Sequence, residues 1–110
     1  MTHELALLRR EERNGALVVH VSGEIDLSNA DELHGRIHRE LRGAPLVVVD
    51  LAEIAYIDSQ GLRLLKRLSD QLEGEGARLE VVAPPDSIAR DVLELTRMGE
   101  EITIRDALGA

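Results

Sequence analysis

The sequence predicts an α/β fold: a mixed, mostly parallel sheet of four to five strands, with an N-terminal hairpin and three to four helices packed against it. Two observations predict this fold. The Asn14-Gly15 pair joins two strand-like segments, and apolar runs rich in β-branched residues then alternate with segments whose leucines recur at helical spacing. Because the chain has 110 residues and no linker or internal repeat, residues 1–110 are expected to form a single domain.

The first element is a hairpin. Residues 4–13 carry three leucines followed by charged residues, which favours an edge strand. Asn14 and Gly15 both tolerate a positive φ, and the apolar run at residues 16–21 is typical of a second strand that pairs antiparallel with the first. Gly23 is expected to end this second strand.

The next segment predicts a helix. Ser28 and Asp31 match the capping pattern in which side chains accept hydrogen bonds from the free amides of the first turn. The core-facing stripe has a spacing of four residues and consists of Leu33, Ile37 and Leu41. His34 and His38 have ligand-like spacing, but a metal site needs three or four convergent donors. These two histidines are therefore expected on a solvated polar face.

A central strand and a second helix follow. The continuous apolar run at residues 46–49 is typical of a strand that is covered on both faces. A second helix is expected to begin at Ser59. Its core-facing stripe consists of Leu62, Leu65, Leu68 and Leu72.

The C-terminal part repeats the strand–helix alternation. Residues 79–82 predict a strand, and Ser87 can cap a third helix. The apolar residues of that helix are Ile88, Val92 and Leu95. Residues 102–104 predict a short last strand.

Composition and charge limit the classes of function. Thirteen Lys and Arg against 21 Asp and Glu give a net charge of −8, and there is one Tyr but no Phe or Trp. Such a chain gains little from counterion release and lacks rings for base stacking, so it is not expected to bind nucleic acid. It has no cysteine for a disulfide or thiol catalysis. The charged N-terminus argues against a signal peptide, and no apolar run approaches the roughly 20 residues that span a bilayer. A cytoplasmic protein without membrane insertion is expected.

Asp58 and Ser59 open the second helix, and this position allows two interpretations. In the first, Ser59 is the N-cap and Asp58 interacts favourably with the helix dipole. In the second, the helix start is a switch. Free amides there tolerate a phosphate, and phosphorylation of Ser59 would add about −1.5 to −2 charges where another protein docks. Spacing alone leaves both interpretations open.

Two motifs together resemble the STAS domain of bacterial anti-sigma factor antagonists. They are Gly23-Glu24-Ile25-Asp26 and Ile57-Asp58-Ser59-Gln60-Gly61-Leu62. Their separation and the order of the elements match that family along essentially the whole chain. One departure is Gln60, where the family usually has a second Ser or Thr. This departure leaves Ser59 as the only phosphate acceptor in the motif.

The resemblance implies a protein without catalytic activity or cofactor that is switched by phosphorylation of Ser59. The unmodified form would bind an anti-sigma factor that is also a serine kinase, and so release a sigma factor. A metal-dependent serine phosphatase would restore binding. The docking surface implied by the resemblance consists of Gly23, Glu24, Asp26, Asp58, Gln60, Gly61, Leu62 and Arg63. The chain is expected to be a monomer or a weak dimer. It lacks the nucleophile-elbow and phosphate-loop motifs of common enzyme classes.

Three other functions stay open at this point. A STAS subunit bound to the cytosolic ATPase of a lipid ABC transporter would share the fold and the docking surface. A scaffold of a large stress-sensing assembly is another alternative. The last is a small-ligand or nucleotide-binding module that uses the amides at the helix start.

Overall fold

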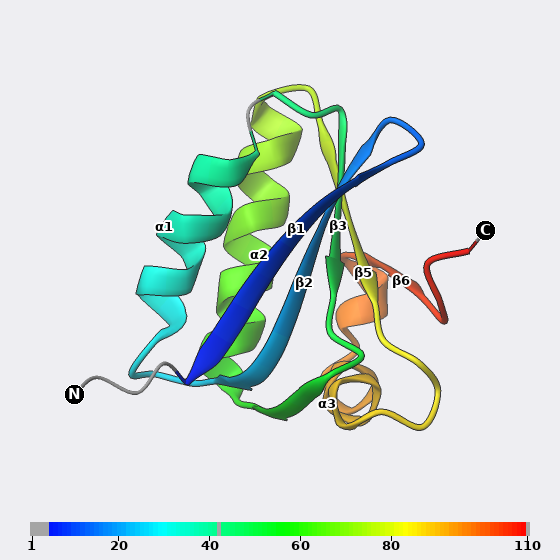
Figure 1. Cartoon of the computed structure of the whole chain (residues 1–110). Helices are drawn as coiled ribbons and strands as arrows, with labels where there is room; N and C mark the ends of the chain where they lie inside the picture. The colour runs from blue at the N-terminus through cyan, green and yellow to red at the C-terminus, as the bar shows by residue number, and fades with distance from the viewer. Residues whose placement is uncertain (1–4, 42, 110) are drawn as a thin grey trace.

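The chain begins with the predicted antiparallel hairpin, in a computed structural model that describes residues 5–41 and 43–109. Strands β1 (Ala6–Arg13) and β2 (Ala16–Ile25) pair along their length (Figure 1). Asn14 and Gly15 form the turn, with φ angles of 50° and 81°. Both angles lie in the left-handed region that a two-residue hairpin turn requires, so this prediction is confirmed.

The sheet is mixed and mostly parallel, as the sequence predicts. Its main order is β1-β2-β3-β5-β6, in which every pair beyond the hairpin is parallel. The three parallel strands beyond β2 are β3 (Leu46–Asp50), β5 (Arg78–Val82) and β6 (Thr103–Arg105). The sequence prediction of four to five strands misses one more, β4 (Ile54–Ile57), which brings the sheet to six strands. β4 pairs with the second half of β2, beyond the part that pairs with β3.

Gly23 does not end β2, contrary to the sequence prediction, because the strand continues to Ile25 through an irregularity between Gly23 and Glu24. Gly23 has a φ of 96°, and a Cβ atom at this position would lie 2.2 Å from the carbonyl oxygen of Leu5. Only glycine combines this backbone angle with such a close approach of another strand. The first motif therefore lies mostly inside the strand rather than after it.

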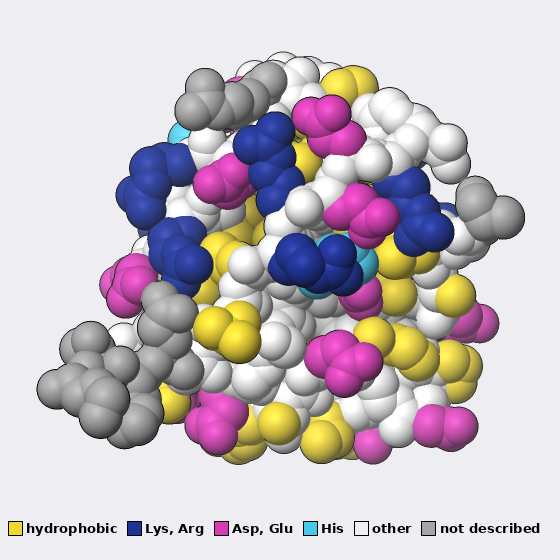
Figure 2. Space-filling view, viewed as in Figure 1, with side chains coloured by type: hydrophobic (Ala, Val, Ile, Leu, Met, Phe, Trp, Pro, Cys, Tyr) yellow, Lys and Arg dark blue, Asp and Glu magenta, His cyan; other side chains and the backbone are white. Residues whose placement is uncertain are grey.

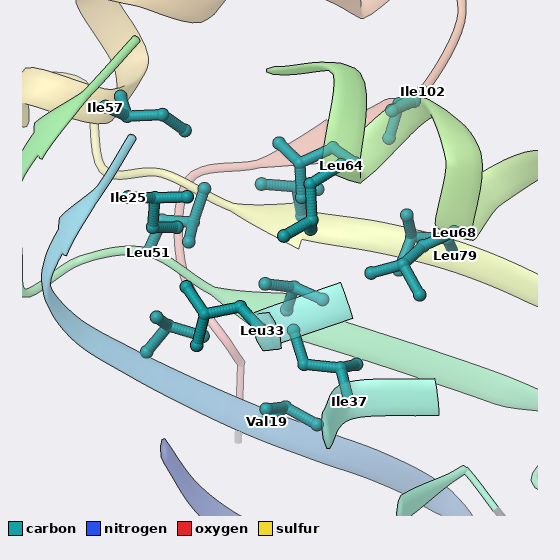
Figure 3. Packing of buried hydrophobic residues seen from close by; sticks show 14 of the residues in the cluster. Val19, Ile25, Leu33, Ile37, Leu51, Ile57, Leu64, Leu68, Leu79 and Ile102 are labelled. Carbon is teal, nitrogen blue, oxygen red and sulfur yellow. The ribbon is translucent and has the colours of Figure 1, made fainter. Parts of the chain in front are cut away.

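Helices α1 (Ala30–Glu40) and α2 (Ser59–Gly74) lie side by side against one face of the sheet (Figure 1). Their predicted leucine and isoleucine stripes are buried, as expected. Figure 3 shows how side chains of both helices meet those of the strands in one apolar cluster. The labelled members are Val19, Ile25, Leu33, Ile37, Leu51, Ile57, Leu64, Leu68, Leu79 and Ile102. The other face of the sheet has a smaller cluster made of Val18, Val48 and Val82.

Helix α3 (Ile88–Leu95) is capped by Ser87, as predicted, since the Ser87 hydroxyl accepts a hydrogen bond from the Arg90 amide at 3.1 Å. Of the three apolar residues that the sequence analysis assigned to this helix, Ile88, Val92 and Leu95, only Val92 packs against the main apolar cluster. Ile88 and Leu95 are 50% and 84% exposed, and the buried residues of the helix are Ala89 and Leu93. This short helix has apolar residues on two faces, and the face that contains the small Ala89 is the one buried in the core. A 3₁₀ turn (Met98–Glu100) links α3 to β6.

The two histidines of α1 differ in their environment. His34 is buried against α2, and its Nε2 lies 2.7 Å from Oε1 of Gln71, so the prediction of a solvated face is wrong for this residue. His38 is exposed and stacks on His34 with ring centres 6.2 Å apart. Among residues 5–41 and 43–109, no three His, Asp or Glu side chains form a group that could hold a metal ion.

Candidate phosphorylation and docking site

The ends of β2 and β4 place the two sequence motifs next to each other. The amide of Asp58 donates a hydrogen bond to the carbonyl oxygen of Ile25 at 3.2 Å, and Ile25 pairs with Ile57 in the sheet. The loop that leaves β2 and the first turn of α2 therefore start from adjacent points. Residues about 30 positions apart in the sequence share one surface because the short strand β4 runs parallel to β2.

Asp58, and not Ser59, is the N-cap of α2. Its Oδ1 accepts hydrogen bonds from the amides of Gln60 at 2.8 Å and Gly61 at 3.3 Å. The interpretation of Ser59 as the cap is therefore wrong. Ser59 is the first helical residue and is exposed, and its hydroxyl forms no hydrogen bond with any residue that the structure describes. The acid holds the helix start in place, and the hydroxyl is left accessible.

Gly61 and Leu62 are buried, so they support the docking surface from below and are not part of its exposed area. A Cβ atom at Gly61 would lie 2.5 Å from Cγ1 of Ile57 and 3.0 Å from Cγ2 of Ile25. The first turn of α2 thus packs directly on the ends of β4 and β2. Leu62, which is 8% exposed, continues this contact into the core. Both residues fix the position of Ser59 relative to the β2 loop.

Gln60 and Arg63 complete the first turn of α2. Gln60 is half-buried, whereas Arg63 is exposed and lies one turn after Ser59. Arg63 forms no ion pair or hydrogen bond with any residue in the described part of the chain. Its guanidinium group is therefore available to a partner or to an anion near Ser59.

The loop after β2 is held by its own side chains. Oδ1 of Asp26 accepts hydrogen bonds from the Ser28 hydroxyl at 2.6 Å and from the Ser28 amide at 2.8 Å, and these bonds lower the pKa of Asp26. The amide of Asp26 donates to the side-chain oxygen of Asn29 at 2.9 Å. Ser28 thus orders the loop and does not cap α1, contrary to the sequence prediction; Asn29 occupies that position without a side-chain cap. Glu24, in β2 before the loop, is exposed.

Four large apolar residues of the β2 loop, β4 and α3 are exposed, and the sequence interpretation did not single out the first two of them. They are Leu27, Tyr56, Ile88 and Leu95, with exposed fractions from 49% to 84%. Leu27 lies in the β2 loop, Tyr56 precedes Ser59 by three residues, and α3 packs against β4. A leucine in an otherwise polar loop and the only aromatic residue of the chain were the available signals. Exposed apolar groups next to polar ones are typical of protein-binding surfaces.

Fold and site together define a small α/β binding domain with an accessible serine at a helix start. The family model for the STAS domain matches residues 8–110, so the chain belongs to the STAS domain family. The anti-sigma-F factor antagonist RsfB of Mycobacterium tuberculosis (strain ATCC 25618 / H37Rv) is 33% identical over 95 residues, which are 86% of this chain and 75% of RsfB. Osmosensory protein A of the same strain is 31% identical over 70 residues, 64% of this chain. The match spans 44% of that protein's length.

Solved structures agree with the family. The crystal structure of an anti-sigma factor antagonist from Mycobacterium paratuberculosis superposes with a TM-score of 0.81 at 29% identity, over 94% of this chain and 87% of that one. SpoIIAA, a Bacillus cell fate determinant, has the same fold in its phosphorylated form, with a TM-score of 0.64 at 19% identity over 90% of this chain and 91% of that one. No helix in the described part of the chain has the length and apolar character needed to cross a membrane.

Proposed function

We propose that this chain is an anti-sigma factor antagonist. In this proposal the unmodified chain binds an anti-sigma factor that is also a serine kinase, and phosphorylation of Ser59 ends the binding. The observation that carries the proposal is the exposed Ser59 hydroxyl. It forms no hydrogen bond with a described residue, because the side chain of Asp58 is the N-cap of the helix. A kinase can reach this hydroxyl without unfolding the helix.

The charge that phosphorylation adds explains how binding would end. A phosphoserine carries about −1.5 to −2 charges, and the helix start tolerates it within the free domain. A partner surface that excludes water around Ser59 would have to desolvate this charge, which opposes the contact. The switch therefore needs no change of fold. It needs only a contact that excludes water around Ser59.

The names of two relatives support the proposal. RsfB and the Mycobacterium paratuberculosis protein are both called anti-sigma factor antagonists, and SpoIIAA has a phosphorylated form. In this chain we assign direct contact with the partner to Glu24, Asp26, Asp58, Gln60 and Arg63. Gly23, Gly61 and Leu62 belong to the same surface by shaping and positioning it. The chain acts by binding, in the cytoplasm, and a metal-dependent serine phosphatase removes the phosphate.

The proposal is tested with an anti-sigma factor kinase from the same organism and ATP. Intact-mass and peptide mass spectrometry should show one phosphate on Ser59, which is absent in Ser59→Ala. Ser28→Ala is the matched control, since Ser28 is exposed in the neighbouring loop and should not alter the stoichiometry. In calorimetry, Ser59→Ala should bind the kinase like the wild type and Ser59→Asp more weakly. Equal phosphorylation of wild type and Ser59→Ala would overturn the proposal.

A co-purification experiment distinguishes the proposal from the alternative of a transporter subunit. If the chain co-purifies with an ABC ATPase and no kinase modifies it, the transporter subunit is the better description. Co-purification with an anti-sigma factor, lost on phosphorylation, supports the antagonist.

A further inference from the structure

We propose that the free edge of β1, together with α1, binds an acidic extended segment of a partner protein as an added strand. This surface shares no residue with the Ser59 docking surface, so its function does not depend on the phosphorylation switch. Three properties of the described residues carry the proposal: unpaired backbone groups, space beside them, and local positive charge.

The unpaired backbone groups follow from the hairpin geometry. Within residues 5–41 and 43–109, β1 is the end strand of the sheet and pairs only with β2. In an antiparallel pair, alternate residues bond to the partner strand, beginning with the pair that closes the two-residue turn, Arg13 and Ala16. The hydrogen bond from the Glu24 amide to the Leu5 carbonyl oxygen, 2.9 Å long, continues the same alternation beyond β1.

Ala6, Leu8, Arg10 and Glu12 are the intervening residues of β1. Their amides and carbonyl oxygens therefore point away from β2, along the outer edge of the sheet. A strand edge of this kind is a template for an additional strand. β1 has eight residues, whereas the opposite edge strand, β6, has three.

Space for such a strand lies between β1 and α1. A cavity of about 200 Å³ is lined by Leu8 and Arg10 of β1 and by Arg36 and Arg39 of α1. A second cavity of about 410 Å³ continues toward the hairpin turn, and Arg10 and Glu40 line both cavities. The Arg10–Glu40 ion pair, 3.0 Å long, links the strand to the helix where the cavities meet. The edge thus lies beside a groove that this ion pair crosses at one point.

Arginines outnumber acidic residues in the groove, which Glu12 and Glu40 also line, in a chain whose net charge is −8. Within the described residues, five of the chain's 13 Lys and Arg line the two cavities: Arg9, Arg10, Arg13, Arg36 and Arg39. Figure 2, viewed as in Figure 1, shows dark blue side chains on this side of the molecule with magenta Asp and Glu side chains between them. Arg39, on α1, is exposed and forms no ion pair or hydrogen bond with a described residue. Arg9 is likewise exposed and unpaired among the described residues, but it lies opposite His20 in the register, so its side chain is on the face of the sheet away from α1. Carboxylates of a partner strand would complement Arg39.

The same features disfavour other occupants. Tyr56 is the only aromatic residue of the chain and lies in β4, so the groove has no ring on which a nucleotide base could stack. A second copy that paired antiparallel about Arg10 would place two Arg10 side chains opposite each other. Pairing about Glu11 would place Arg9 opposite Arg13 and Glu11 opposite its own copy. Like charges directly opposite destabilise a strand pair.

The test uses the full chain and a blocked eight-residue peptide in which Glu alternates with Thr. At low salt, calorimetry should show binding, and hydrogen exchange should show new protection of the Leu8, Arg10 and Glu12 amides. A Lys-Thr peptide should not bind. A Glu-Thr peptide with alternate amides N-methylated keeps its charge but loses backbone donors, so it should bind far more weakly.

Matched arginine variants complete the test. Arg39→Ala should weaken peptide binding about threefold, as expected for an exposed ion pair. Arg78→Ala, on the interior strand β5, should leave it unchanged. Three results would each overturn the proposal: no binding of the Glu-Thr peptide, binding without protection of the three amides, or equal binding of the N-methylated peptide. A dimer that protects these amides without peptide would assign the edge to a second copy and overturn it too.

Discussion

Nε2 of His34 and Oε1 of Gln71 lie 2.7 Å apart across the contact between α1 and α2. Burial of the ring, followed by the nearby Arg67 guanidinium, lowers the pKa of His34 below its ordinary value of 6.5. A buried imidazole that stays neutral is thus part of the contact between the two helices, one of which carries Ser59.

The first prediction concerns the pH dependence of stability. Because the pKa of His34 is lower in the folded state, the unfolded chain binds more protons as the pH falls below about 6.5. The contribution of His34 is present above that pH and is lost as the pH falls toward the folded-state pKa. Urea unfolding of wild type and His34→Gln between pH 7.5 and 5 should show a smaller loss in the variant. His38→Gln, on the exposed side, should keep most of the wild-type loss; an unchanged slope in His34→Gln would contradict the prediction.

The second prediction concerns Gly61. In an exposed helix, replacing Gly by Ala stabilises by roughly 0.5–1 kcal/mol. Gly61→Ala should instead lower the free energy of unfolding by about 1–3 kcal/mol, because the new Cβ would press on Ile57 and Ile25. Gly74→Ala, at the other end of α2 with nothing within 4 Å, is the control and should be neutral or stabilising. Denaturant unfolding measures both; a stabilised Gly61→Ala would show that the close packing does not exist.

The third prediction separates capping from docking at Asp58. Asp58→Ala should lower the free energy of unfolding by about 1 kcal/mol, because the amides of Gln60 and Gly61 lose their acceptor. Asp58→Asn keeps an oxygen acceptor and should remain close to wild type in stability. Since Asn removes the charge, any loss of kinase binding in Asp58→Asn reports on the docking contact itself. Equal stability of Asp58→Ala and wild type would refute the capping role.

The fourth prediction tests which face of α3 is buried. Leu93 is 1% exposed and Leu95 is 84% exposed. Leu93→Ala should lower the free energy of unfolding by about 2–5 kcal/mol, the usual cost of a large-to-small change in a core. Leu95→Ala should change it by less than about 0.5 kcal/mol. If Leu95→Ala were the more damaging variant, the orientation of α3 would be reversed.

Local signals in the sequence were enough to predict the hairpin and the buried faces of the first two helices. Asn14-Gly15 specifies its turn through backbone angles alone. The stripes of α1 and α2 each point to a single face, because the other faces of these helices are polar. α3 carries apolar residues on two faces, so its periodicity did not decide which face is buried.

The missed features depend on contacts between distant residues. β4 has four residues, and it is a strand because β2 extends past β3 and offers a second pairing surface. At the helix start, Asp58 and Ser59 are both preferred capping types in adjacent positions. The extended backbone of Asp58, with φ −110° and ψ −170°, decides between them. The sequence predicted which residues make up the two motifs, but which of them are exposed required the fold.

Among the strands that the structure describes, β4 pairs with β2 alone, at Gly23, Glu24 and Ile25. The strand that precedes Ser59, β4, therefore lies outside the row formed by the other five strands. Substitutions in β4 can tilt or shift Ser59 while the other five strands keep their register. A domain organised in this way can acquire new binding partners through changes in a handful of positions, and its folding core need not evolve with them.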